Sequence, residues 1–571
     1  MAKIQEAWSS RLGVILAVAG SAVGLGNFLR FPGQAAQYGG GAFMIAYFVS
    51  LLIVGIPICW TEWTLGRYGG RFGFHSTSGI FHALLRKPWG KYLGVIGFIV
   101  PVMIYMYYVY IEAWCLGYAV NALSGRLSEP GINYGEFFGR FTGAGGDGIA
   151  LHFGLGDVGI FLVLVYLLNF FFIYRGITKG IETVCKIAMP ALIAIAIIIL
   201  VRVLTLGTPD AAKPDQNVIN GLGFMWNPSS VAVLDAATGT EVARYPDAAA
   251  IPAAYQTEAF TQKALNLWQT LFNPQLWLAA AGQIFFSLSV GFGVIITYAS
   301  YLRKKDDVVL SGLTASATNE FCEVGLGGLI TVPAAFMFLG AAGIVGQGTF
   351  GLGFNVLPEV FARMPGGQIF ASSFFLLLFL AAITSSLSML QPGIAFLEEG
   401  LGIERKASVA LLGLVTAIGT MFVWYFSADL KALDTIDFWV GTVMLFVQAT
   451  ILIIIFGWVV GIEKGWQIAH EGAEMRIPDI FKVIIKYITP AFLVAIFVMF
   501  TLKNVFGWNF SFSAPEFNPT AYVQDLVGDK PNHVARLSVG LIAIMTVFSL
   551  LLVNIAGKVW AKRDIIEKEN H

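Results

Sequence analysis

Residues 17–32 read Ala-Val-Ala-Gly-Ser-Ala-Val-Gly-Leu-Gly-Asn-Phe-Leu-Arg-Phe-Pro, in a place where an ordinary membrane helix would be expected. The chain has no charge from Leu12 to Leu29, so the segment is apolar enough to enter a bilayer. Three glycines interrupt it, and glycine disfavours a helix interior by roughly 1 kcal/mol relative to alanine. A backbone break is tolerated at membrane depth only where it lines an enclosed cavity. The stretch therefore predicts a binding site inside the membrane.

A second stretch of the same kind begins at Phe285 and reads Phe-Phe-Ser-Leu-Ser-Val-Gly-Phe-Gly. Both stretches lie in a chain of 571 residues that is 57% hydrophobic and 12% charged, against about 25% charged residues in soluble domains. The mean hydropathy is +0.74. These values predict an integral membrane protein with many spans. The formal net charge is zero, so we expect no nucleic-acid partner.

Twelve segments have the apolar length that crosses a bilayer, about 20 residues. They lie at residues 11–37, 41–65, 92–124, 157–175, 180–205, 276–302, 311–341, 370–398, 407–426, 437–462, 483–502 and 538–560. We therefore predict an all-α membrane protein with twelve transmembrane helices. The interrupted segments are the first and the sixth, so each opens a set of five spans. Because five is odd, the second set must enter the membrane from the opposite side, which makes the two sets inverted repeats.

This arrangement divides the chain into a first repeat, a long outer loop, a second repeat and a C-terminal part with two spans and a cytoplasmic tail. The four parts comprise residues 1–205, 206–275, 276–462 and 463–571. The second repeat includes an outer lid at about residues 343–369, where glycine and proline punctuate a short amphipathic piece. In the outer loop, residues 231–234 and 241–245 flank the sequence Asp-Ala-Ala-Thr-Gly. This pattern indicates a small β-hairpin, with an irregular loop as the alternative.

Lysine and arginine gather after the second, fourth, sixth and eighth spans and near the end of the chain, while the alternate loops are neutral or acidic. The positive-inside rule therefore places these loops and both termini in the cytoplasm. The opening residues, Met-Ala-Lys-Ile-Gln-Glu, show no cleavable signal peptide, so the first span is expected to be kept. The four cysteines lie in or beside apolar segments without a CxxC pair, which argues against a disulfide or a metal site.

Five ordered blocks stand out in and around the interrupted spans, at residues 11–32, 55–70, 107–112, 282–301 and 383–392. With these blocks the chain resembles the neurotransmitter:sodium symporter family, and most closely its bacterial leucine-transporter members. The resemblance covers nearly the whole chain. It implies sodium-coupled symport of a neutral amino acid into the cell by alternating access, with two sodium ions.

The resemblance implies two sodium sites built from oxygen atoms, the ligands that hard cations prefer. The residues of the first site are Ala22, Asn27, Ser287 and Asn319, and the carboxylate of the substrate completes it. The residues of the second site are Gly20, Val23, Ala381, Thr384 and Ser385. Taken alone, Thr384 and its two following serines would also suit polar packing between helices, which is common in membrane bundles.

The resemblance also implies a substrate pocket between the interrupted spans and spans 3 and 8. Its residues are Ser21, Ala22, Leu25, Gly26, Ile104, Tyr108, Phe286, Ser287, Ser289, Phe292, Ser385 and Met389. The helix that starts near Leu25 offers backbone N–H groups and a positive dipole end to a carboxylate. The hydroxyl of Tyr108 would hold the same carboxylate, and freed carbonyls around Ser21 and Phe286 would bind the ammonium group.

Gly24 indicates the class of substrate. Monoamine carriers of the family have aspartate here because their substrates lack a carboxylate, whereas glycine leaves the acid to the substrate. Ile104, Phe292 and Met389 make the side-chain end of the pocket apolar and uncharged. The resemblance therefore implies a neutral amino acid with a medium-to-large aliphatic or aromatic side chain. The preferred amino acid stays open, because Ser21, Ile104 and Met389 differ from the leucine transporter.

The resemblance implies gates on both sides of the site. Arg30 and Asp437 match the outer gate pair, although Asp437 would also suit the N-cap of the tenth span. The inner gate network matches Trp8, Tyr301 and Glu399. The basic residue that the family has near its N-terminus is glutamine here, at Gln5, and Lys3 is the candidate substitute.

Glu62, Glu112 and Glu323 are carboxylates inside spans, where each costs about 2.5–3.5 kcal/mol on insertion scales. Such a cost makes a paired or functional role the default expectation. Glu62 is expected to cap broken backbone, with simple packing as the alternative. Glu323 stands where chloride-dependent relatives have serine, near Tyr47 and Gln283. Its carboxylate is expected to replace the anion and to make transport independent of chloride.

Other functions stay open on the same fold, namely a proton-coupled or facilitative amino-acid carrier and an amino-acid sensor or channel. The oxygen set of the sodium sites is intact and favours sodium, and the gates on both sides argue against an open channel. No HExxH, GxSxG or P-loop motif occurs and the six histidines lack metal spacing, so we predict no enzyme. The expected partners are the neutral amino acid and the lipid bilayer of a prokaryotic inner (plasma) membrane, with a homodimer left open.

Overall fold

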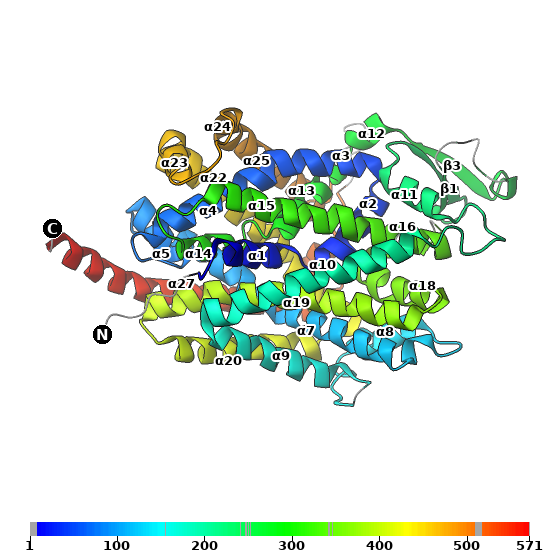
Figure 1. Ribbon diagram of the computed structural model, residues 1–571, viewed down its shortest axis with the longest axis horizontal. Coiled ribbons are helices and arrows are strands. Elements are labelled where there is room, and N and C mark those ends of the chain that lie inside the picture. Colours follow the sequence, from blue (N-terminus) through cyan, green and yellow to red (C-terminus); the bar gives the residue numbers. More distant parts are fainter. Residues whose placement is uncertain are drawn as a thin grey trace.

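The computed structural model describes residues 8–154, 156–239, 241–245, 248, 251, 253–340, 343–344, 347–508 and 517–569. It is built almost entirely of long helices, with one small sheet at one end (Figure 1). In this part of the chain, nine helices are long and apolar enough to cross a membrane, and one bent pair adds a tenth.

The two remaining spans are short or broken. Helix α9, Val158–Tyr174, is an apolar helix of only 17 residues. The sixth span consists of α13, Pro274–Leu288, and α14, Val294–Ser300, with residues 289–293 between them. Every predicted span therefore has its counterpart, and the predicted fold class, a twelve-span helical membrane protein with unwound first and sixth helices, is confirmed.

The other helices of the first five spans follow the predicted segments closely. They are α1 Arg11–Ala22, η1 Gly26–Arg30, α2 Phe31–Gln37, α3 Gly41–Ser50, η2 Leu51–Gly55, α4 Ile56–Gly70, α7 Ile96–Leu123, η4 Ile177–Glu182 and α10 Thr183–Leu204. Short helices connect these spans, namely α5 Thr77–Leu85, α6 Gly90–Leu93, η3 Arg126–Ser128 and α8 Tyr134–Thr142.

The later spans and their connections complete the bundle. The spans are α15 Val308–Glu320, η7 Phe321–Gly328, α16 Leu329–Leu339, α19 Gly367–Leu401, α20 Arg405–Tyr425, α21 Lys431–Ile436, η11 Asp437–Met444, α22 Leu445–Ile454, η12 Ile455–Gly461, α23 Ile462–Ala469, α24 Ile480–Val483, η13 Ile484–Ile488, α25 Thr489–Phe500, η14 Thr501–Val505 and α27 His533–Glu569. The outer connections are α17 Gly348–Gly351, η9 Leu352–Val356, α18 Leu357–Arg363, η10 Ala428–Leu430 and α26 Ala521–Val527.

The first span breaks where the glycines predict it. Helix α1 ends at Ala22, and Val23 takes an extended conformation with φ −73° and ψ 94°. The chain returns to helix at Gly26, and the two halves of the span meet at an angle of 48°. The side-chain oxygen of Asn27 accepts a hydrogen bond of 2.9 Å from the backbone N–H of Gly24. Asn27 thereby satisfies one of the donors that the break releases.

The sixth span breaks through three residues with left-handed backbone, Ser289, Gly291 and Gly293. At Gly293 only glycine fits, because a Cβ atom would lie 1.8 Å from the carbonyl oxygen of Gly97. The carboxylate of Glu62 accepts a hydrogen bond of 3.1 Å from the backbone N–H of Gly291. The expectation that Glu62 caps broken backbone is therefore confirmed.

The tenth span begins earlier than the predicted residue 437. A helix starts at Lys431 and continues through Asp437, whose φ of −60° and ψ of −42° are helical. The N-cap interpretation of Asp437 is therefore wrong. The first turns contain the charged residues Lys431 and Asp434, so they lie outside the apolar run from which the span was predicted. The last helical residue of this span is Ala469.

The outer loop contains helices α11, Val218–Trp226, and α12, Leu267–Leu271, beside a three-stranded antiparallel sheet. The strands are β1 Ser230–Asp235, β2 Glu241–Tyr245 and β3 Phe260–Leu265, in the order β2-β1-β3. Strands β1 and β2 pair where the sequence indicates a hairpin. In Figure 1 the sheet lies at the end of the molecule opposite the C-terminal end of α27.

Helix α4 of the second span packs tightly on α14, the inner half of the sixth. A Cβ atom at Gly66 would lie 2.2 Å from the carbonyl oxygen of Ile296, and one at Gly70 would lie 2.0 Å from that of Ser300. The pair is a small-xxx-small motif, which lets two membrane helices approach through their backbones. We call this contact the Gly66–Gly70 seam.

Substitution of Gly66 by alanine should destabilise the protein by about 1–3 kcal/mol or more, because the methyl group must displace backbone. The measurement is the thermal unfolding temperature in detergent. Gly540→Ala is the matched control, since a Cβ atom there meets nothing within 4 Å. Equal unfolding temperatures for the two variants would contradict the tight seam.

Candidate functional site

A cavity of about 390 Å³ lies between the two broken spans, spans 3, 8 and 10, and residues 347–351 of the outer connection. Eleven of the twelve predicted pocket residues line it, namely Ser21, Ala22, Leu25, Gly26, Ile104, Tyr108, Phe286, Ser289, Phe292, Ser385 and Met389. Ser287, the twelfth, lies instead among the residues predicted for the first sodium site. Residues 347–351 fall within the segment that the sequence suggests as an outer lid.

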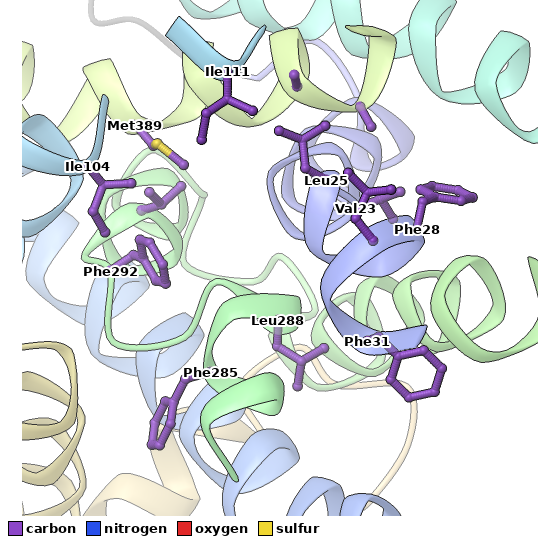
Figure 2. Packing of buried hydrophobic residues seen from close by; sticks show 14 of the residues in the cluster. Val23, Leu25, Phe28, Phe31, Ile104, Ile111, Phe285, Leu288, Phe292 and Met389 are labelled. Carbon is purple, nitrogen blue, oxygen red and sulfur yellow. The ribbon is translucent and has the colours of Figure 1, made fainter. Parts of the chain in front are cut away.

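The cavity has an apolar end. Among the lining residues, Figure 2 shows Ile104, Met389 and Phe292 close together, across from Leu25 of the first span. The ring of Phe292 makes an edge contact with that of Phe286, with 5.8 Å between the ring centroids. Ile104, Phe292 and Met389, the described lining residues named at this end, carry no charge. An uncharged side chain of a ligand would suit it.

The opposite end of the cavity holds polar groups around Gly24. The hydroxyl of Tyr108 lies 3.5 Å from the backbone nitrogen of Leu25. A Cβ atom at Gly24 would lie 3.0 Å from that hydroxyl and 3.1 Å from Oγ of Ser385. The hydroxyl of Ser289 donates a hydrogen bond of 2.8 Å to the carbonyl of Ser21, which ties the two breaks together. Glycine at position 24 thus keeps this end open.

Three of the four residues predicted for the first sodium site, Asn27, Ser287 and Asn319, meet beside the first break. Nδ2 of Asn27 donates to Oδ1 of Asn319 over 2.8 Å. Asn319 in turn donates to the hydroxyl of Ser287, and that hydroxyl donates to Glu323. Ala22 is buried at the end of α1 and lines the cavity next to this cluster. The cluster groups buried side-chain oxygens, the kind of ligand that hard cations prefer.

The residues predicted for the second sodium site also come together. The hydroxyl of Ser385 lies 3.2 Å from the carbonyl oxygen of Gly20 and 3.1 Å from that of Ala381. The hydroxyl of Thr384 lies 3.1 Å from the same carbonyl of Ala381. Val23 is buried where the backbone leaves the helix. Span 8 therefore offers the hydroxyl of Ser385 to the carbonyls at the end of α1, while the hydroxyl of Thr384 bonds within its own helix.

Glu323 is fully buried and lies in the first cluster. It accepts hydrogen bonds from Gln283, at 2.5 Å, and from Ser287. The hydroxyl of Tyr47 donates instead to Glu320, over 2.7 Å. Glu320 is not among the residues predicted from the sequence, although its position three residues before Glu323 on one helix would have indicated it.

The outer gate residues lie at the mouth of the cavity without a direct ion pair between them. Among the described residues, Arg30 and Asp437 have no nitrogen–oxygen distance within 4.0 Å. The guanidinium of Arg30 lies over the ring of Phe286, 4.0 Å from its centroid. Asp437 accepts a hydrogen bond of 2.6 Å from Tyr107. Asp434, one turn earlier, also lines the mouth and was missed by the sequence analysis.

The residues predicted for the inner gate contact several different partners. The indole N–H of Trp8 donates to the carbonyl of Tyr298 over 3.0 Å. Tyr301 accepts a hydrogen bond of 3.2 Å from Gln391 and stacks on the ring of His75. Glu399 accepts hydrogen bonds from the backbone N–H groups of His75 and the following serine. Gln5 and Lys3 lie outside the described residues.

Glu182, which the sequence analysis also missed, ties the start of α1 to the fifth span. Its carboxylate accepts a hydrogen bond of 3.0 Å from the backbone N–H of Ser9 and pairs with Lys186 over 2.7 Å. A Cβ atom at Gly13 would lie 1.9 Å from this carboxylate. The acidic group next to the N-terminus of a helix also suits the helix dipole.

Two broken spans around a membrane cavity, with oxygen clusters beside it, define a membrane transporter. Residues 5–131 and 255–554 match the model of the sodium:neurotransmitter symporter family. The chain therefore belongs to the sodium:neurotransmitter symporter family. It is a multi-pass, sodium-dependent symporter and not an enzyme.

Comparisons with individual proteins agree with this family membership. The chain is 30% identical to an uncharacterized sodium-dependent transporter of Methanocaldococcus jannaschii, over 88% of this chain and 91% of the relative. It is 25% identical to a sodium- and chloride-dependent taurine transporter of Canis lupus familiaris, over 88% and 79%. The crystal structure of MhsT in complex with L-phenylalanine is similar, with a TM-score of 0.68, 27% identity, and 86% of this chain and 99% of MhsT covered.

Proposed function

We propose that this symporter couples the uptake of a neutral amino acid to two sodium ions and does not require chloride. One observation carries the proposal: the cavity has an uncharged end at Ile104, Phe292 and Met389 and an open polar end at Gly24. A free amino acid has the matching shape, with charged groups at one end and a side chain at the other. The binding of L-phenylalanine by MhsT supports an aromatic or large aliphatic side chain.

Two sodium ions are proposed because two separate oxygen clusters flank the first break. The first contains Asn27 and Asn319, and the second contains Ser385 beside the carbonyl of Gly20. A substrate carboxylate near Gly24 would lie close to both and would link ion binding to substrate binding. Two sodium ions that enter down a membrane potential of about 100 mV and a tenfold sodium gradient would supply roughly 7 kcal/mol. This free energy supports at most about 10⁵-fold accumulation of the amino acid.

We further propose that the protein lies in the plasma membrane of a prokaryote with both termini in the cytoplasm. The distribution of lysine and arginine supports this orientation. The sheet of the outer loop then faces the external solution, at the end of the molecule opposite the C-terminal end of α27.

The test is uptake into proteoliposomes under an imposed sodium gradient, in chloride-free and chloride-containing solutions. The panel contains L-leucine, L-phenylalanine, glycine, L-aspartate and phenethylamine, which lacks the carboxylate. We expect sodium-dependent accumulation of L-leucine or L-phenylalanine at the same rate in both solutions. Accumulation of phenethylamine alone, or no sodium-dependent accumulation of any neutral amino acid, would contradict the proposal.

A further inference from the structure

The membrane interior contains a second polar group, away from the cavity and from the gates. Glu112 of α7 is fully buried, and so are Asn169 of α9 and Ser386 of α19. These three side chains come from spans 3, 4 and 8. None of them lines the cavity described above, so the transport site does not by itself explain an acidic group at this depth.

The three side chains form one chain of hydrogen bonds. Nδ2 of Asn169 donates to both carboxylate oxygens of Glu112, at 3.1 and 3.2 Å, and to the carbonyl of Val165. Oδ1 of Asn169 accepts from the hydroxyl of Ser386 over 2.7 Å. That hydroxyl also lies 3.1 Å from the carbonyl of Ile383, within its own helix. Glu112 therefore fixes the amide of Asn169 with its oxygen directed at Ser386.

Ser386 directly follows Thr384 and Ser385, which carry the hydroxyls proposed for the second sodium site. Residues 385 and 386 point to different neighbours. Ser385 faces the carbonyl of Gly20 in the first span, and Ser386 faces Asn169 in the fourth. The hydrogen-bonded chain therefore holds span 8 at the turn where its hydroxyls meet the first span. In a close-packed interior, a shift of that turn would change every oxygen distance at the site.

We propose that Glu112, Asn169 and Ser386 are positioning residues for the second sodium site. They hold Thr384 and Ser385 at the distances that a sodium ion requires, without contacting the ion. The inference rests on the proposed function, since it takes the second cluster as a sodium site. Substitution of residues that orient metal ligands without contacting the metal commonly lowers metal affinity by 10–100-fold.

The test measures binding of radioactive sodium to the purified, full-length protein in detergent, at a saturating concentration of L-leucine or L-phenylalanine, whose carboxylate is proposed to complete the first site. In Ser386→Ala and Asn169→Ala, one class of sodium sites should require about tenfold more sodium for half-saturation, while the other class stays unchanged. The double variant should be no weaker than either single variant, because both substitutions break the same chain. Glu112→Leu should also raise the sodium concentration for half-saturation of that class about tenfold. Glu112→Gln keeps an oxygen that accepts the hydrogen bond from Asn169, so it should bind sodium as the unaltered protein does.

The matched control is Ser408→Ala. Ser408 is also a fully buried serine of a neighbouring span, α20, and its hydroxyl has no hydrogen-bond partner among the described residues. Ser408→Ala should bind sodium as the unaltered protein does. Unchanged half-saturation in Ser386→Ala and Asn169→Ala, equal weakening of both classes of sites, or additive effects in the double variant would each overturn the inference. Absence of sodium binding in the unaltered protein would instead reject the proposed function.

Discussion

Glu323→Ser should make transport depend on chloride, whereas the unaltered protein is proposed not to require it. The carboxylate accepts hydrogen bonds from Gln283 and Ser287 in a fully buried place beside the predicted first sodium site. Serine would leave these donors and the bound cation without a negative charge. Hydrogen bonds to charged groups contribute about 1.5–3 kcal/mol, so uptake in chloride-free solution should fall about tenfold to a hundredfold. Chloride can enter the space that the shorter side chain vacates and restore the charge.

The measurement is sodium-driven uptake in gluconate and in chloride solutions. Glu320→Ser is the matched control, because this carboxylate lies three residues earlier on the same span and accepts from Tyr47 rather than from Ser287. Chloride should have no effect on sodium-driven uptake by Glu320→Ser. If uptake by Glu323→Ser is the same in both solutions, then Glu323 does not stand in for an anion.

Gly24→Asp should abolish the uptake of neutral amino acids. A Cβ atom at this position would already lie 3.0 Å from the hydroxyl of Tyr108 and 3.1 Å from that of Ser385. The carboxylate beyond it would occupy the end of the cavity where the acid of the substrate is proposed to bind. Juxtaposed like charges cost several kcal/mol, so binding should weaken by on the order of a hundredfold or more.

The measurement is binding of labelled L-leucine and L-phenylalanine at saturating sodium, followed by the same assay with phenethylamine. Gly282→Ala is the control, since a Cβ atom there meets nothing within 4 Å. It should bind amino acids as the unaltered protein does. Tight binding of an amino acid by Gly24→Asp would show that the carboxylate is held elsewhere.

The sequence was sufficient to predict the parts of the site that depend on backbone. Glycines inside apolar spans located both breaks, because a helix interrupted at membrane depth must line a cavity that satisfies its freed backbone groups. The resemblance then named residues that the fold brings together, such as Asn27 with Asn319 and Ser385 with Gly20.

The sequence was less informative where a contact depends on side-chain direction or on charge near a span end. Arg30 and Asp437 were expected to face one another, but each contacts an aromatic residue instead, and such choices follow from packing. Glu182 lies near the start of its span, where an acidic residue could equally face solvent or headgroups. Glu320 lies inside its span, but the sequence alone does not show that it, rather than Glu323, accepts the hydrogen bond from Tyr47. Strand β3 is largely exposed and polar, so no alternation of apolar residues marked it.

The Gly66–Gly70 seam sets a limit on how the transporter can move. Its two backbones touch so closely that the helices cannot slide or part without losing the contact. We therefore expect α4 and α14 to move as one rigid body during transport. Spectroscopic probes on the two sides of the seam would report a constant separation through a complete transport cycle, while probes from α4 to α19 would not.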